Sequence, residues 1–327
     1  MAKTNIIVQL EQRLKAIAPD VIVDWTYVER YKKYSEWSRQ IVSFRNYSQS
    51  EALKAIFDLE IPNWDTYFKE ATSGNGNEIN RIMTLHSSAL LPLLCFSQVS
   101  SRRPLCIDGI KYTEVFFEVK NHVFYSPSNV DVVLKSAHGD LLFLESKFTE
   151  YLEVERPKIK ESYFEFYHHI LTKYSSFPIV MQYPCVWEEN GKRHIGFTIK
   201  TTYRDSKDSL AYCAGIKQCF SHLIGIAKVP SNSNSDCWRG SERGKLTFST
   251  ILYRFGGEPF KIYQQLYEDT IGKLSPEDIG QALNGDCNNS NIERLHILKS
   301  VLTYQELFAT DENIDFLNEK VKSYYNL

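Results

Sequence analysis

Three closely spaced apolar segments limit the folds that this chain can adopt. They cover residues 113–119, 130–136 and 141–147, and each is rich in β-branched or aromatic side chains, as β-strands are. A short polar loop joins the second and third segments, which is typical of a β-hairpin. A helix is expected over about 210–227 and a further strand over 244–255. This order predicts an α/β fold in which helices cover a mixed central sheet.

The remaining segments are expected to add helices to this sheet. Apolar residues recur at spacings of three and four within residues 6–67, including 23–37, which predicts a series of short helices. Asn77 can cap a helix that continues to about Phe96. We therefore expect one domain over residues 1–327, with a helical N-terminal cap over 1–72, a core over 73–255 and a C-terminal helical extension over 256–327.

Composition excludes several classes of protein. A formal charge of −2, from 38 basic and 40 acidic residues, rules out a uniformly basic surface, so a nucleic acid would need a local patch. The seven cysteines form no CxxC pair, which argues against a disulfide framework and against a cysteine-based zinc site. The sequence has no apolar run of membrane-spanning length, and its N-terminus resembles a helix more than a signal peptide. We expect a cytoplasmic protein with no membrane partner.

Charged residues interrupt the strand expected over 141–147, which is otherwise apolar on both faces. Because side chains alternate along a strand, Glu145 and Lys147 project on the same face as Phe143. If the hairpin has a three-residue loop with Gly139 in the left-handed position, Asp131 falls opposite Glu145. Two facing carboxylates repel each other unless a cation or proton lies between them, and such hard oxygen ligands suit Mg²⁺ or Mn²⁺. Asp131 and Glu145 are therefore candidate metal ligands.

Lys147 completes the candidate catalytic group. Its side chain can orient or deprotonate a water molecule that the metal ion activates. The pattern has an ordinary explanation as well, in which Asp131 ends a strand and Glu145 and Lys147 form cross-strand ion pairs. A D-x13-ExK string is short enough to occur by chance.

A family resemblance favours the catalytic interpretation. The segment 127–153 resembles the core of the PD-(D/E)xK nuclease superfamily, with Pro127 and Asp131 as its "PD" element and Glu145-Ser146-Lys147 as its "ExK". Three residues separate Pro127 from Asp131, so the pair is not contiguous, as is common in that superfamily. Five further strings resemble a group of bacterial restriction-endonuclease-like proteins; they are GNGNE (74–78), LHSSALL (85–91), FFEVK (116–120), ESKFTEYL (145–152) and KQCFSHLIGI (217–226).

The resemblance also suggests accessory site residues. The superfamily often adds a glutamate from the first core helix, which Glu78 matches, and Glu118 is the rival candidate on the preceding strand. Both have ordinary explanations, as a first-turn carboxylate that stabilises a helix and as a strand surface charge. Lys217 and Gln218 are expected to line the substrate cleft. His222 lies four residues after Gln218, and such a histidine is more often a packing residue than a ligand.

These features together imply a metal-dependent nuclease that hydrolyses phosphodiester bonds of DNA, with Mg²⁺ or Mn²⁺ as cofactor. The resemblance implies a restriction-endonuclease-like sheet and a role in restriction or bacterial defence, and it leaves a homodimer open. The choice of DNA over RNA rests on this analogy alone. The alternative is a catalytically inactive nuclease-fold module that binds nucleic acid or another partner.

Overall fold

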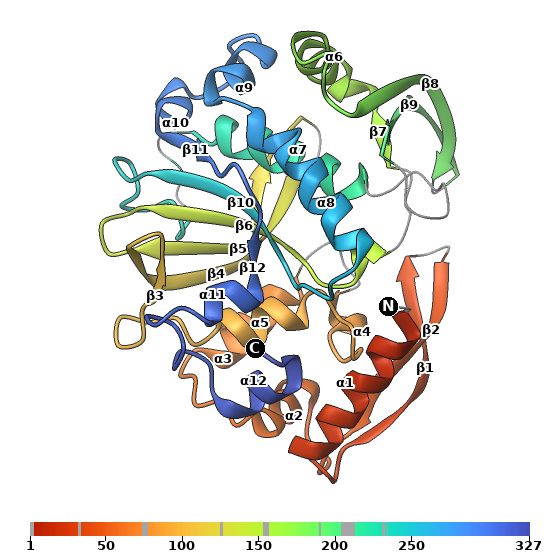
Figure 1. Ribbon diagram of the computed structural model, residues 1–327, viewed down its shortest axis with the longest axis vertical. Coiled ribbons are helices and arrows are strands. Elements are labelled where there is room, and N and C mark those ends of the chain that lie inside the picture. Colours follow the sequence, from red (N-terminus) through yellow and green to blue (C-terminus); the bar gives the residue numbers. More distant parts are fainter. Residues whose placement is uncertain are drawn as a thin grey trace.

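In the computed structural model of the protein, a curled mixed sheet is flanked by helices on both faces (Figure 1). The structure describes residues 3–31, 34–73, 78–124, 127–152, 157–189, 191–203, 213–230, 233 and 235–327. Strands of the central sheet follow the order β11-β10-β6-β5-β4-β3, and β12 pairs with β10. They are β3 (Leu105–Ile107), β4 (Ile110–His122), β5 (Pro127–Ser136), β6 (Leu141–Lys147), β10 (Leu246–Leu252), β11 (Leu295–Ile297) and β12 (Leu302–Thr303).

The central strands match those expected from the sequence. β4, β5 and β6 are antiparallel neighbours, and β10 lies parallel to β6 after the chain has passed through α7 (Cys213–Lys228). In the loop between β5 and β6, Gly139 has a φ of +84°, and the amide of Ser136 donates to the carbonyl of Asp140 over 2.9 Å. The expected mixed α/β sheet and its hairpin are thus confirmed.

Two hydrophobic clusters cover the two faces of the sheet. Along β6, Leu142 and Leu144 belong to one cluster, and Leu141 and Phe143 belong to the other, as strand alternation requires. The first cluster includes α1 (Lys3–Ile17), α2 (Gln49–Ile56), α3 (Trp64–Ala71), α5 (Leu90–Phe96), α11 (Tyr304–Phe308) and α12 (Glu319–Tyr325). The second includes α6 (Phe164–Lys173), α7, α8 (Glu258–Glu268) and α9 (Pro276–Ala282), near α10 (Asn289–Arg294).

The N-terminal region is not wholly helical, so the expected helical cap over 1–72 was wrong in part. Residues 23–31 and 34–37 lie within the antiparallel pair of β1 (Ile22–Tyr31) and β2 (Tyr34–Ser43). Alternate residues of this segment are also apolar or aromatic, and the hairpin buries Val23 against the first cluster at its base. A period-two pattern in an aromatic-rich segment therefore outweighed the helical spacing.

The single helix expected from Asn77 to Phe96 was also wrong. The chain forms α4 (Glu78–Arg81) and α5, and Asn77 itself lies outside the described residues. Between these helices the backbone runs along β2, where Ile41 donates to the carbonyl of Met83 and Leu85 donates to the carbonyl of Arg39. Because these backbone groups bond to a strand, the helix cannot continue through them.

A second small sheet lies beside the second cluster. It has the order β7-β9-β8, with β7 (Lys158–Lys160), β8 (Ile179–Glu189) and β9 (Lys192–Thr201). Short 3₁₀ turns complete the fold at Glu150–Leu152, Glu161–Tyr163 and Ile271–Lys273. In Figure 1 the β8–β9 hairpin stands above the β1–β2 hairpin on the same side of the molecule.

Candidate active site

The C-terminal half of β6 and the first half of β5 place Asp131 beside Glu145. Regular pairing between the two strands ends at Val132 and Leu144. Asp131 is the next residue of β5 and falls opposite Glu145, which is the register expected from a three-residue loop. The backbone amide of Ser146 donates to Asp131 Oδ2 over 2.7 Å. One oxygen of Asp131 is therefore fixed against the neighbouring strand.

Glu145 lies at the centre of a buried chain of polar groups. Its Oε1 is 2.5 Å from Lys147 Nζ, and its Oε2 is 2.5 Å from His222 Nε2. The other ring nitrogen of His222, Nδ1, is 2.5 Å from Ser128 Oγ. Glu145 is fully buried, and the other three side chains are each less than a tenth exposed. The chain thus joins β5, β6 and α7 beneath the surface.

The charges of these hydrogen-bonded side chains stabilise one another. Burial alone would raise the pKa of Glu145, but the ammonium of Lys147 and the imidazole of His222 outweigh it and lower the pKa to about 2. Burial alone would lower the pKa of Lys147, but the carboxylates of Glu145, Glu150 and Asp131 raise it well above its usual value. In this arrangement Glu145 is an anion and Lys147 is a cation.

Further carboxylates surround this pair. Desolvation and the charge of Glu145 raise the pKa of Asp131 well above its usual value. Burial, with repulsion from Glu78 and Glu145, raises the pKa of Glu118 to about 8. Glu118 has a φ of +49° on β4, a backbone conformation that non-glycine residues seldom adopt, and Asn129 donates to its Oε2 over 3.3 Å. Both accessory candidates therefore contribute to one acidic cluster.

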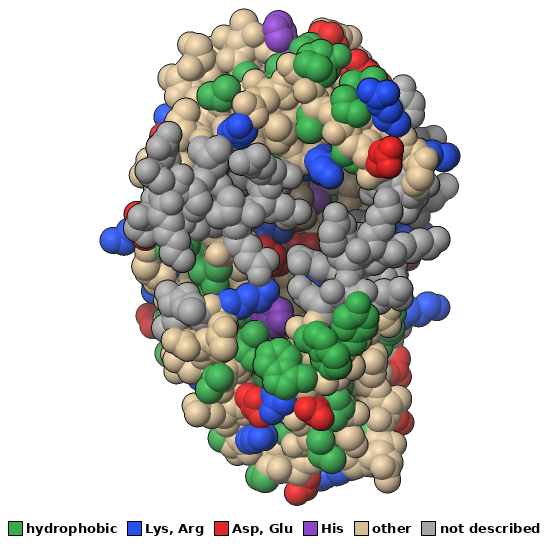
Figure 2. Space-filling view, turned by 90° about the vertical axis from the view of Figure 1, so that its right-hand side faces the viewer, with side chains coloured by type: hydrophobic (Ala, Val, Ile, Leu, Met, Phe, Trp, Pro, Cys, Tyr) green, Lys and Arg blue, Asp and Glu red, His purple; other side chains and the backbone are tan. Residues whose placement is uncertain are grey.

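This region of the molecule is hollowed. Figure 2 views the side on which the β1–β2 and β8–β9 hairpins lie, and it shows acidic side chains in a central hollow with basic and histidine side chains around it. Asp131, Glu118 and Glu78 are the half-buried members of the acidic cluster. On α7, Lys217 is half-buried and Gln218 is exposed. Their assignment to the substrate cleft stays a prediction.

The cluster has the donor set that a hard divalent cation prefers. Mg²⁺ is usually bound by one or two carboxylates together with water and substrate phosphates. Among the described residues, no three or more His, Cys, Asp or Glu side chains already surround a common metal position. Lys147 Nζ lies 2.5 Å from Glu145 Oε1. Asp131 and Glu145 fit as a two-carboxylate site if Lys147 moves off that oxygen.

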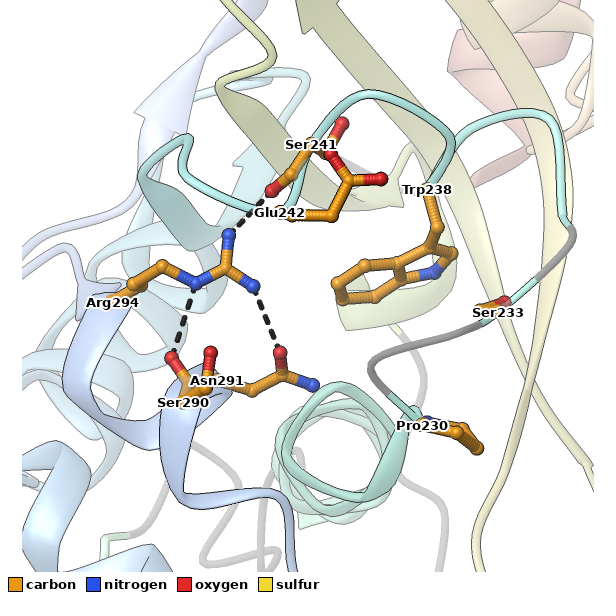
Figure 3. Close-up of a pocket in the computed structure, with 8 residues that line it drawn as sticks. All are labelled: Pro230, Ser233, Trp238, Ser241, Glu242, Ser290, Asn291 and Arg294. Carbon is orange, nitrogen blue, oxygen red and sulfur yellow. Dashed lines mark hydrogen bonds between the residues drawn. The ribbon is translucent and has the colours of Figure 1, made fainter.

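A separate surface pocket between α10 and the loop that follows α7 offers no comparable chemistry. It is lined by Trp238, Glu242, Arg294 and their neighbours (Figure 3). The Arg294 guanidinium donates to the carbonyls of Ser241, Gly244 and Ser290 and to the side chain of Asn291. The Arg294 guanidinium thus already ties the loop before β10 to α10.

The sequence predicted neither the contact of His222 with Glu145 nor any role for Ser128. The spacing of Gln218 and His222 on one helix face and the string at 217–226 pointed to His222, but such a histidine is more often a packing residue than a ligand. Ser128 lies three residues before Asp131 on β5, and nothing in its local sequence marks it. The two residues are 94 positions apart, so only the packing of α7 against β5 shows that they meet.

Comparisons with known proteins add no assignment. No model of a protein family, no curated protein and no solved structure shows significant similarity to the chain. Among the described residues, no helix is long and apolar enough to cross a membrane. Any functional assignment must therefore rest on the residues of the site and on their geometry.

Proposed function

We propose that the chain is a Mg²⁺-dependent nuclease with a restriction-endonuclease-like fold that hydrolyses phosphodiester bonds of DNA. It would act in the cytoplasm, as a monomer or homodimer, in a restriction or defence system. The observation that carries the proposal is the cluster of Asp131, Glu145 and Lys147 on two neighbouring strands, where burial and like charges raise the pKa of Asp131 and Glu118. Titratable groups with strongly shifted pKa values gather most often at functional sites.

Each residue of the cluster has a role under this proposal. Asp131 and Glu145 would hold the ion, and Glu118 or Glu78 would hold water around it. A bound divalent ion lowers the pKa of water and stabilises negative charge on phosphate oxygens. Because the surrounding carboxylates raise its pKa, Lys147 is a cation that donates hydrogen bonds. It therefore suits orientation of a water molecule or phosphate oxygen better than removal of a proton.

The hairpin near the hollow favours nucleic acid as the substrate class. Trp25, Tyr27 and Trp37 are each more than half exposed on β1 and β2, and the rings of Tyr27 and Trp37 meet edge to face at 5.6 Å. Figure 2 shows hydrophobic side chains on the lower half of the molecule, directly below the hollow. Exposed aromatic rings offer stacking surfaces for bases without regard to sequence. The preference for DNA over RNA still rests on the family resemblance.

One observation favours the second candidate, an inactive nuclease-fold module. Both oxygens of Glu145 already have partners, Lys147 and His222, so the buried charges are satisfied without an ion. A closed ion-pair network of this kind can be purely structural. The two candidates differ in one respect: only the nuclease must bind a divalent ion at Asp131 and Glu145.

The proposal is tested by measuring metal binding and cleavage in the same samples. We expect the full-length protein to bind Mn²⁺ in calorimetry and to nick or cut plasmid DNA when Mg²⁺ or Mn²⁺ is added. Asp131→Asn keeps the size of the side chain but removes a ligand charge, so it should weaken Mn²⁺ binding at least about tenfold and abolish cleavage. Asp236→Asn, at an exposed position on the loop before β10, is the matched control. Equal Mn²⁺ binding and cleavage by Asp131→Asn would reject the assigned site.

A further inference from the structure

Both ring nitrogens of His222 are paired with residues of the central sheet. The side chain projects from α7 toward the sheet, with Glu145 of β6 at Nε2 and Ser128 of β5 at Nδ1, both at 2.5 Å. His222 is 3% exposed, and the centroid of its ring lies 6.2 Å from the centroid of the Phe248 ring. Because both ring nitrogens have partners, the ring cannot turn without losing one of two buried hydrogen bonds. The position of Glu145 Oε2 is therefore fixed by α7.

The two oxygens of Glu145 are held in different ways. His222 fixes Oε2 with a short, rigid side chain, whereas Lys147 reaches Oε1 with a flexible four-carbon stem. Of the four hydrogen-bonded side chains, Ser128, His222, Glu145 and Lys147, the proposed reaction requires only Glu145 and Lys147. Oε1 is thus the oxygen that can exchange its partner, and Oε2 is the oxygen that stays in place.

We propose that His222, supported by Ser128, is a positioning residue that presents Glu145 to a divalent ion through Oε1 alone. This inference rests on the proposed metal site. Under this inference, the hydrogen bond from His222 Nε2 on α7 orients the carboxylate of Glu145. Glu145 would then bind the ion through one oxygen only. Hydrogen bonds of this kind to a ligand fix its orientation, and their removal typically weakens metal binding about 10- to 100-fold.

A merely structural histidine would behave differently. Its loss would lower the stability of the protein, but the affinity of the remaining folded protein for Mn²⁺ would not change. A positioning histidine must change that affinity, and a side chain that restores a donor near Oε2 must recover it. Glutamine can place its amide nitrogen near the position of Nε2, whereas leucine fills the space without a donor.

The test is Mn²⁺ affinity by calorimetry, beside urea unfolding, for His222→Leu, His222→Gln and Ser128→Ala in the full chain. We expect His222→Leu to weaken Mn²⁺ binding about 10- to 100-fold, His222→Gln to recover most of the loss, and Ser128→Ala to lose less than His222→Leu. His168→Gln, an exposed histidine on α6, should bind as wild type does. If His222→Leu does not fold, the glutamine and Ser128→Ala variants decide.

The outcomes separate this inference from the function on which it rests. If wild type binds Mn²⁺ and Asp131→Asn does not, but the His222 and Ser128 variants bind as wild type, the metal site stands and the positioning role is wrong. If wild type itself binds no Mn²⁺, both the metal site and the positioning role are wrong. A loss in His222→Gln as large as in His222→Leu would also contradict a role through the hydrogen bond to Oε2.

Discussion

Replacement of either Glu145 or Lys147 is expected to abolish Mg²⁺-dependent DNA cleavage, with a loss on the order of 10³-fold or more for each. Glutamine at 145 and methionine at 147 are the informative substitutions, because the two residues form a buried ion pair. Either substitution still removes one charge of the pair and leaves its partner buried without it, which typically costs about 3–5 kcal/mol of stability, so unfolding in urea is measured beside cleavage. Alanine would add a cavity to that cost, because both side chains are buried, whereas glutamine and methionine keep most of the volume.

The two losses should not add. The ion held by Glu145 and the ammonium of Lys147 act on the same attacking water and phosphate, so the double variant should be little worse than either single one. Cleavage of plasmid DNA is measured for Glu145→Gln, Lys147→Met and both together, with Lys111→Met as an exposed control on β4. Wild-type cleavage by Glu145→Gln would reject the site.

DNA binding without metal should respond in the opposite sense to these two changes. Glu145→Gln removes a negative charge from the site, so affinity should stay level or rise, whereas Lys147→Met should weaken it slightly. An equal drop in both variants would indicate that the fold has been damaged.

The second large effect concerns stability, and its sign is opposite to that of most substitutions. Glu118→Gln should stabilise the metal-free protein at pH 8 by on the order of 2 kcal/mol. The pKa of Glu118 is raised from 4.5 to about 8 by burial and by the charges of Glu78 and Glu145. A carboxyl group with a raised pKa in the folded state contributes stability that is present below pH 4.5 and is lost as the pH rises toward 8.

Glutamine at position 118 should avoid the loss of stability between pH 5 and pH 8, because it carries no charge at any pH. The measurement is urea unfolding in EDTA at pH 5 and at pH 8, compared between variant and wild type. The advantage of Glu118→Gln should be small at pH 5 and large at pH 8. Glu114→Gln, on the same strand with an exposed side chain, is the control and should show no such trend. If Glu118→Gln is no more stable than wild type at pH 8, burial and the charges of Glu78 and Glu145 do not raise the pKa of Glu118 in the folded protein.

A stabilising Glu118→Gln would also bear on function. Charges that destabilise the folded protein persist where activity requires them, so a gain in stability together with a loss of Mn²⁺ affinity would fit an accessory ligand. A gain in stability with unchanged Mn²⁺ affinity would instead assign the accessory role to Glu78 or to neither residue.

The features that the sequence predicted correctly are those that depend on neighbouring residues. The hairpin of β5 and β6 follows from its apolar strands and from Gly139, and these local features also fix the register that places Asp131 opposite Glu145. The alternation of Phe143, Glu145 and Lys147 on one face is a direct consequence of strand geometry.

The features that the sequence did not predict depend on contacts between distant segments. The segment 23–37 carries apolar residues at spacings that suit both a helix and a strand. The pairing of β1 with β2 decided between them. The break between α4 and α5 results from hydrogen bonds to β2. The chain from Ser128 through His222 to Glu145 requires α7 to pack on the sheet, which no local pattern specifies.

The most direct test of the metal site is a crystal structure after a soak in Mn²⁺, with anomalous data to locate the ion. We expect one Mn²⁺ bound by Asp131 and by Glu145 Oε1 at about 2.0–2.6 Å, with the two carboxylates within about 6 Å of each other and Lys147 displaced from Oε1. An ion bound elsewhere, or no ion with Lys147 still on Oε1 at saturating Mn²⁺, would contradict the site.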